Sequence, residues 1–231
     1  MFPKQALQFF RGLEKNNNRE WFETKKPVYE ASVKAPMLAL VDTLNGDFLN
    51  FAPEYVVDPR KAVLRIYRDV RFSKNKTPYK TNVAAEFRRH NFAKGEAASF
   101  YFHLDTKGVM VAGGIYNPMP EHLKLIRAYI AEHHEEFRKL IAAKKLRSLM
   151  GDLQGDQLKR MPKGYFPGHP AEDLLKRKMY VFWTTLPPGL AETPDLRAEI
   201  SKRLAAVSPI VEFLNRPLLA NRRPLHFDMS K

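Results

Sequence analysis

The chain has 231 residues, 44% of them hydrophobic and 12% aromatic, which is enough apolar surface for a substantial core and argues against disorder. It contains no cysteine, so disulfides, thiolate nucleophiles and cysteine-ligated metals are excluded. The net charge of +14 favours an anionic partner such as a nucleic acid, an anionic lipid or a phosphorylated small molecule, with a basic, solvated surface as the alternative.

No membrane element is predicted. The first five residues lack the basic and then apolar pattern of a signal peptide. No apolar run approaches the roughly 20 residues that a helix needs to span a bilayer. We therefore expect a cytoplasmic protein that makes no contact with a membrane.

The first fifty residues predict helices, because their apolar residues recur at helical spacing. Asn16-Asn17-Asn18 marks a turn that can also cap the helix beginning at Arg19. Pro27 and Pro36 are expected to break or kink that second helical segment.

From residue 56 the hydrophobic period changes towards two, which predicts strands. The expected strands are residues 62–72, 82–87, 99–104, 109–114 and 179–183. Residues 105–108 form a turn that joins the third and fourth strands as a hairpin. The meandering order and the short connections favour antiparallel pairing.

Three further helices are expected, at residues 117–141, 171–178 and 193–214. Helices, then strands, then helices describe an α+β fold. We predict a single domain over residues 1–231, in which an antiparallel or mixed sheet of about five strands packs against N-terminal, central and C-terminal helices.

Positive charge concentrates between residues 60 and 94, where eleven Lys and Arg residues stand against only Asp69 and Glu86. This stretch holds nine of the fourteen excess positive charges of the chain. Local crowding of like charge on strand-like residues indicates a preformed site for a negatively charged partner. It is the strongest functional signal in the sequence.

The alternation of a regular strand would sort the central residues of this stretch into two faces. One face would carry Arg65, Tyr67, Asp69 and Arg71, and the other Leu64, Ile66, Arg68, Val70 and Phe72. An arginine on the apolar face needs a carboxylate, carbonyls or an external anion, because burying an unpaired guanidinium is costly. A bulge near Asp69 would bring its carboxylate to Arg68.

Two interpretations of this cluster stay open. In the first, Arg65 and Arg71 form a fork for a carboxylate or phosphate. Lys76 and Lys80 then add charge, and Asp69 orients an arginine or accepts a proton. In the second, Asp69 is the centre of an internal ion-pair network. We favour the anion site, because one carboxylate cannot neutralise so many cations, although the two arrangements can coexist.

The same residues resemble a family signature. Arg65-x-x-Arg68-Asp69-x-Arg71-Phe72, followed by Lys76 and Tyr79, is similar to the signature of a bacterial family known as Domain of Unknown Function 2461. Further likenesses are Asn17-x-Arg19-Glu20-Trp21-Phe22, Gly113-Gly114-x-Tyr116 and Pro162-Lys163-Gly164-Tyr165. The resemblance runs nearly end to end. It implies a roughly full-length bacterial domain with no established activity, cofactor or catalytic residue.

Weaker signals lie elsewhere. Tyr116 could stack on a ligand or donate to it beside Gly113-Gly114, although a strand-end kink is the favoured role of the glycines. His169 shares a Pro- and Gly-rich loop with Lys163 and is a candidate for acid–base work, although loop ordering or helix capping is favoured. The adjacent His133-His134 diverge on a helix, so no metal site is predicted.

We predict a protein that binds a small phosphorylated or carboxylated ligand, with no cofactor. The predicted ligand-binding residues are Arg65, Arg68, Arg71, Lys76, Lys80, Tyr116 and Lys163. Catalysis is unsupported by any motif but not excluded. If the protein is an enzyme, the candidates for proton transfer are Asp69, Tyr79 and His169.

Two alternatives use the same basic stretch. The first is nucleic-acid binding, for which the expected stacking partners are Tyr67, Phe72, Tyr79, Phe87 and Phe92. It predicts an affinity that falls steeply with salt, because binding releases counterions from the phosphates. The second alternative is a protein-interaction domain for an acidic partner.

Overall fold

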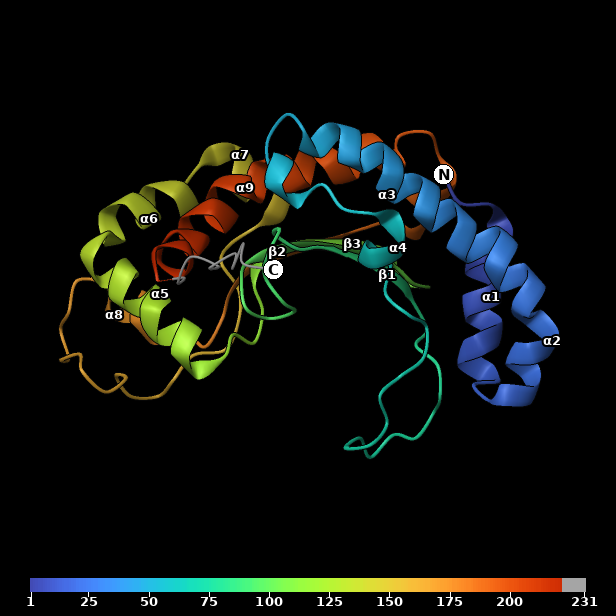
Figure 1. Cartoon of the computed structure of the whole chain (residues 1–231), viewed down its shortest axis with the longest axis horizontal. Coiled ribbons are helices and arrows are strands. Elements are labelled where there is room, and N and C mark those ends of the chain that lie inside the picture. Colours follow the sequence, from blue (N-terminus) through green and yellow to red (C-terminus); the bar gives the residue numbers. More distant parts are fainter. Residues whose placement is uncertain (222–231) are drawn as a thin grey trace, which may run out of the picture.

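Helices pack on one face of an antiparallel sheet in the computed structural model, which describes residues 1–221 (Figure 1). The four strands of these residues lie side by side in sequence order, and every neighbouring pair is antiparallel. They are β1 (Val83–Phe87), β2 (Ser99–Leu104), β3 (Val109–Ile115) and β4 (Tyr180–Leu186). The predicted α+β class is confirmed. Four of the expected strands form, whereas residues 62–72 form no strand.

The N-terminal part of the chain, residues 1–62, is mainly helical, as predicted for the first fifty residues. Its elements are α1 (Lys4–Lys15), α2 (Arg19–Tyr29), η1 (Glu30–Lys34), α3 (Ala35–Phe48), η2 (Pro53–Tyr55) and α4 (Pro59–Ala62). Asn18 caps α2 by accepting a hydrogen bond from the backbone N–H of Trp21 at 2.9 Å. Between Pro27 and Pro36 the helix widens into the π-helical turn η1 instead of breaking, since proline removes one donor from the regular ladder.

Between β3 and residue 221, the chain is mainly helical apart from β4 and an irregular segment at residues 151–171. Its elements are α5 (Pro120–Glu132), α6 (His134–Ile141), α7 (Lys144–Met150), α8 (Glu172–Leu175), η3 (Pro188–Glu192) and α9 (Leu196–Ala220). The single helix expected over residues 117–141 is in fact two helices that meet at His133. Within residues 1–221, no helix is both long enough and apolar enough to cross a bilayer.

The core lies between the sheet and the layer of α3 and α9 (Figure 1). Along β2 the side chains of Phe100, Phe102 and Leu104 are buried, and the residues between them are only half-buried. Gly113 of β3 lies under α9, where a Cβ atom would collide with the side chain of Val207. This glycine therefore lets the helix approach the sheet closely, so its role is in packing.

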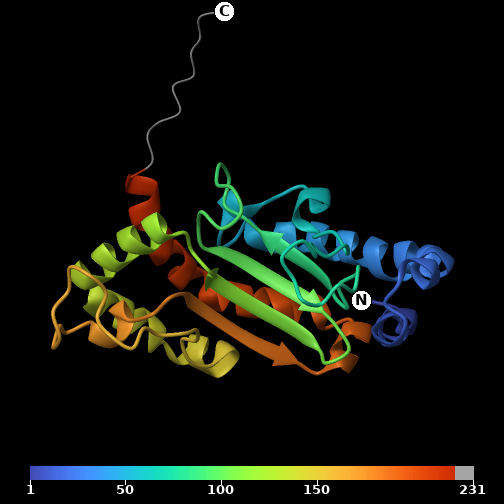
Figure 2. The ribbon, with the colours of Figure 1, turned by 90° about the horizontal axis from the view of Figure 1, so that it is seen from below.

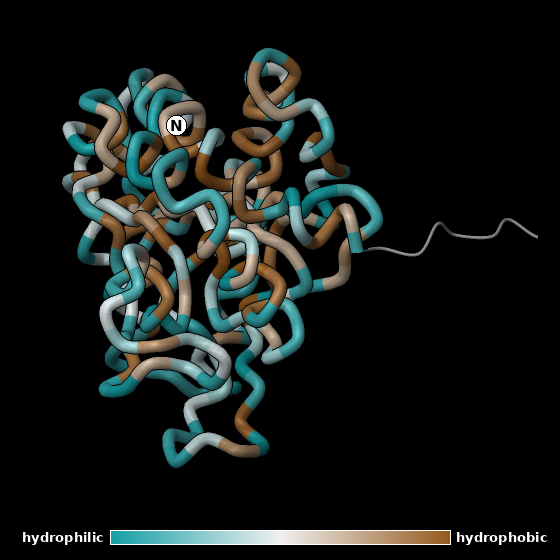
Figure 3. The backbone as a smooth tube through the Cα atoms, turned by 90° about the vertical axis from the view of Figure 1, so that its left-hand side faces the viewer, coloured by the Kyte–Doolittle hydropathy of each residue, from teal (hydrophilic) through white to brown (hydrophobic). Residues whose placement is uncertain are grey.

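No helix crosses the opposite face of the sheet among the described residues (Figure 2). Tyr101, His103 and Trp183 lie half-buried on that face, and the Tyr101 hydroxyl is 3.1 Å from His103 Nδ1. Figure 3 shows hydrophilic and hydrophobic turns alternating along the helices, as expected where each helix covers the sheet with one side only.

Candidate anion-binding site

The basic stretch forms an irregular hairpin instead of a regular strand. Isolated bridges join Val63 to Ala85 in β1 and Tyr67 to Tyr79. Four residue steps separate the two bridges on the first arm and six on the second, so the second arm carries two extra residues. This mismatch prevents a regular ladder. We call residues 63–82 the basic hairpin.

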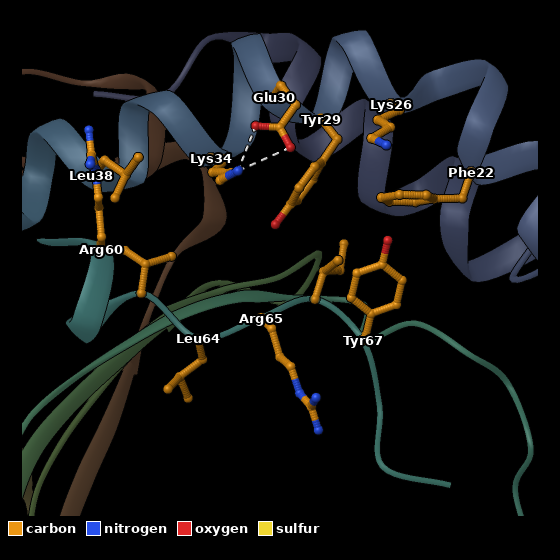
Figure 4. Close-up of a pocket in the computed structure, with 12 residues that line it drawn as sticks. Phe22, Lys26, Tyr29, Glu30, Lys34, Leu38, Arg60, Leu64, Arg65 and Tyr67 are labelled. Carbon is orange, nitrogen blue, oxygen red and sulfur yellow. Dashed lines mark hydrogen bonds and ion pairs between the residues drawn. The ribbon is translucent and has the colours of Figure 1, made fainter.

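The predicted alternation of side chains is wrong because the pairing is irregular. Figure 4 shows Tyr67 pointing towards α2 and Arg65 pointing away from the helices, although both were expected on one face. Phe72 was expected on the core face and is 96% exposed. The hairpin projects from the β1 edge beyond the plane of the sheet (Figure 1), so its outer part has no second layer to pack against.

The base of the hairpin is attached to the N-terminal helices through Asn17. Its amide Nδ2 donates to the carbonyl of Tyr79 at 3.0 Å, and its Oδ1 accepts from the N–H of Tyr79 at 3.1 Å. The Tyr79 ring stacks on Phe22 of α2 with ring centroids 4.1 Å apart, and only 3% of Tyr79 is exposed. Tyr79 therefore holds the hairpin in place, and its ring is not presented to solvent.

Asp69 forms its ion pair with Arg71. The guanidinium donates to Asp69 through Nε at 3.0 Å and through Nη2 at 2.7 Å, and the backbone N–H of Arg71 donates to Oδ1 at 3.2 Å. These hydrogen bonds from Arg71 lower the pKa of Asp69 to about 2. Both side chains are largely exposed, so this pair is a surface contact that orients Arg71.

The other cations of the hairpin are held by neutral groups. Arg68 donates to the hydroxyl of Thr77. Lys76 Nζ donates to the carbonyl of Val70, and Lys80 Nζ to the carbonyl of Arg65, each at 2.9 Å. No carboxylate within residues 1–221 makes an ion pair with these side chains. Their positions are fixed, and their positive charge is not neutralised.

A cavity of about 480 Å³ opens between the basic hairpin and the helices above it (Figure 4). Its upper wall comes from α2, η1 and α3, and its lower wall from residues 60–67. The polar residues that line it are Lys26, Tyr29, Glu30, Lys34, Arg60, Arg65 and Tyr67. Phe22 and Leu38 are among the apolar residues of its walls. Arg65 contributes to the lining, although its guanidinium points outward.

Two tyrosine hydroxyls face this cavity from opposite walls. Tyr29 points down from the end of α2, and Tyr67 points up from the hairpin (Figure 4). Burial, with smaller effects from Glu30 and Tyr67, raises the pKa of Tyr29 to about 12. The phenol therefore stays protonated at neutral pH and can donate. Neither hydroxyl makes a hydrogen bond to another described residue.

The cavity has more cations than acids. Lys34 Nζ lies 2.8 and 3.1 Å from the two carboxylate oxygens of Glu30, the one acid that lines the walls. Lys26 Nζ lies 3.8 Å from Glu23 Oε2, and an exposed ion pair at this distance contributes little. The Arg60 side chain runs towards α3 (Figure 4) and has no carboxylate partner among residues 1–221. The walls therefore suit an anion.

Sequence patterning missed most of this cavity. The sequence predicts a helical stretch with an apolar core face here, and it contains Lys26, Tyr29, Glu30 and Lys34. Their spacing of three and four residues places them on one side of the helix, and a polar stripe of this kind was the available signal. Arg60 was counted in the basic stretch but was not selected as a ligand residue.

Of the predicted ligand residues, Arg65 alone lines the cavity. Arg68, Arg71, Lys76 and Lys80 lie elsewhere on the basic hairpin, and the other two predicted residues lie away from both the cavity and the hairpin. Tyr116 follows β3, whose register places it at the end of the sheet opposite the hairpin. Lys163 is exposed in the segment between α7 and α8, which Figures 1 and 2 place far from α1 and α2. In the same segment, His169 Nδ1 accepts from the N–H of Ala171 at 3.0 Å, so this ring orders the start of α8.

The candidates for proton transfer do not meet in one place. Asp69 is at the exposed hairpin, Tyr79 is buried at its base, and His169 lies near α8. No group of three or more His, Asp or Glu residues in the described part of the chain could hold a metal ion. The cavity instead brings together hydrogen-bond donors and cations, which is an arrangement suited to an anion.

These features define an α+β protein with a cationic cavity beside a projecting basic hairpin. The sequence model of a family described as "Conserved hypothetical protein (DUF2461)" matches residues 5–213. The chain therefore belongs to the Domain of Unknown Function 2461 family, the family that the sequence resemblance indicated. Comparison with curated proteins and with solved structures found no match.

Proposed function

We propose that the chain binds a small organic anion, a carboxylate or a phosphate with an apolar body, in the cavity between α2–α3 and the basic hairpin. One observation carries this proposal: the hydroxyls of Tyr29 and Tyr67 face a cationic cavity and have no acceptor among the described residues. Protonated phenols and cations are all donors, and an oxyanion supplies the acceptors that they lack.

The walls suggest how such a ligand would be oriented. Its anionic group would accept from Tyr29 and Tyr67, the positive charges of Lys34 and Arg60 on the walls would attract it, and its apolar body would pack on Phe22 and Leu38. We propose binding without catalysis, because the carboxylate that lines the cavity is already held by Lys34. A general base needs a free acceptor within reach of the ligand.

Thermal-shift and calorimetric titrations with phenyl phosphate, benzoate and inorganic phosphate test this proposal. We expect phenyl phosphate to bind more tightly than inorganic phosphate, because only the ester also buries a ring. Tyr67→Phe should weaken binding by about 5- to 10-fold, the usual effect of losing a neutral hydrogen bond. Arg60→Ala should weaken binding by a smaller factor, because it removes a positive charge from the wall and no direct contact with the anionic group.

Matched controls come from the same residue types outside the cavity. Arg11→Ala removes an exposed arginine of α1, and Tyr116→Phe removes a hydroxyl at the far end of the sheet. Both should leave the dissociation constants unchanged. Equal losses in the controls and the cavity variants, or no saturable binding of any of the three probes, would refute the proposed site.

A further inference from the structure

The outer part of the basic hairpin presents one aromatic side chain to solvent beside a cation. We define residues 69–77 as the tip. Phe72 is 96% exposed, and the guanidinium carbon of Arg71 lies 5.8 Å from the centre of its ring. The bidentate contact with Asp69 orients that guanidinium. A phenyl ring exposed to this extent contributes nothing to the core and is accessible to a partner.

The hairpin is also strongly positive. Residues 63–82 contain six Lys and Arg residues and the single acid Asp69, which pairs with Arg71. The remaining cations are held by hydroxyls and carbonyls or have no ion-pair partner in the described part of the chain. Burial, followed by the charges of Lys94 and Arg65, lowers the pKa of Lys80, which reflects how crowded this positive charge is.

The aromatic side chains of the basic stretch differ in how accessible they are to a partner. Phe87 is completely buried and Tyr79 is 3% exposed, so neither can stack on a partner. Tyr67 is 47% exposed, but its ring lies against Tyr79 with centroids 5.4 Å apart and its hydroxyl faces the cavity. Phe72 is the most exposed aromatic side chain of this stretch, and Arg71 lies beside its ring.

We propose that the tip of the basic hairpin binds single-stranded nucleic acid, with an unpaired base stacked on Phe72 and the neighbouring phosphates held by Lys74 and Lys76. An exposed aromatic ring within a positively charged, projecting element is the combination that such strands recognise. Duplex is a poorer partner, because its bases are already stacked on one another. This inference is independent of the proposed cavity ligand.

The composition of the tip disfavours a lipid surface. Phe72 is followed by Ser73-Lys74-Asn75-Lys76-Thr77, so one large apolar side chain stands among polar ones. Stable membrane docking needs a larger apolar area or a second anchor. Stacking needs only one ring per base, which the tip supplies.

Fluorescence anisotropy with labelled 20-nucleotide oligo(dT) and oligo(U), at several salt concentrations, tests the inference. We expect salt-dependent binding to the single strands that exceeds binding to a 20-base-pair duplex. Phe72→Ala should weaken binding about tenfold without changing the salt slope, because stacking releases no counterions. The double variant Lys74→Ala/Lys76→Ala should reduce the slope by about 1.4, since each lost phosphate contact on a single strand removes about 0.7.

Phe166→Ala is the matched control, because Phe166 is 63% exposed and lies in the distant segment before α8. It should bind like the unmodified chain, and so should Arg11→Ala, which removes an exposed arginine of α1 outside both proposed sites. The proposal is overturned if Phe72→Ala and Phe166→Ala behave alike, if duplex binds as tightly, if no oligonucleotide binds, or if Phe72-dependent binding appears only with vesicles of phosphatidylcholine and phosphatidylserine. All variants are at exposed positions, and equal melting temperatures will verify folding.

Discussion

Asn17 shows how one side chain can determine the position of the basic hairpin. Its amide satisfies both the N–H and the carbonyl of Tyr79, which is 62 positions away in the chain. The two hydrogen bonds attach the second arm of the basic hairpin to the turn between α1 and α2. Asn17 and Tyr79 belong to different motifs of the family resemblance, and the structure joins them by direct contact.

Replacing Asn17 should therefore destabilise the fold. Asn17→Ala leaves two partly buried backbone groups of Tyr79 without partners, at a cost of about 1–3 kcal/mol in the free energy of unfolding. Urea denaturation at constant m value measures this change. Asn50→Ala serves as the control, because the Asn50 side chain makes one exposed 3.4 Å contact, and it should change stability by less than about 0.5 kcal/mol.

At the scale of elements, the distance between α9 and the sheet depends on Gly113. The side chain of Val207 occupies the space that a Cβ atom would need there. α9 covers β3 along its length and also bonds to the loop before β2, where the Oδ1 of the buried Asn215 accepts from the N–H of Ala98 at 2.8 Å. A shift of this helix would disturb both contacts.

Gly113→Ala should destabilise the protein by about 1–3 kcal/mol, the usual effect of overpacking a core. Val207→Ala makes room for the new methyl group, so the double variant should be more stable than the sum of the single changes implies, with a coupling of about 0.5–3 kcal/mol. Gly46→Ala, in α3 with open space around it, should instead stabilise the helix by up to about 1 kcal/mol. Additive losses would contradict this account of the packing.

The strands also show where sequence patterning succeeds and fails. Residues 99–104 and 109–114 were correctly predicted, because a short turn pairs them locally and a helix layer buries alternate side chains. Residues 62–72 also have apolar side chains at alternating positions, but their partner follows a loop and carries two extra residues. An apolar side chain such as Phe72 indicates a core face only where a second layer covers it.

At the scale of the molecule, ionisation limits the pH range of full stability. Folding raises the pKa of Tyr29 from 10.0 to about 12, chiefly through burial, and that of Tyr101 likewise to about 12. A group whose pKa is raised on folding contributes fully below its unfolded value and loses that contribution as pH rises through its folded value. Asp69 is the opposite case, since its pKa falls from 3.8 to about 2 and its contribution is lost in acid.

We therefore expect stability to decline between pH 10 and pH 12, as these buried phenols ionise. Tyr29→Phe should make the alkaline decline shallower, because one fewer buried phenol must ionise. Tyr116→Phe, at a side chain 72% exposed, should not alter it. Urea midpoints measured from pH 7 to pH 11.5 provide the comparison, and identical alkaline slopes for the two variants would contradict the assignment.

By itself, the sequence determined the α+β class, four strands, most of the helices, the positive region and the family. Each of these follows from local periodicity, composition or a linear motif. Only the tertiary structure decided that Lys26, Tyr29 and Lys34 face Arg60 and Tyr67 across a cavity, and that Phe72 stands in solvent. Those facts depend on distances between segments far apart in the chain, which are set by how the helices and the irregular hairpin pack, and no local pattern encodes them.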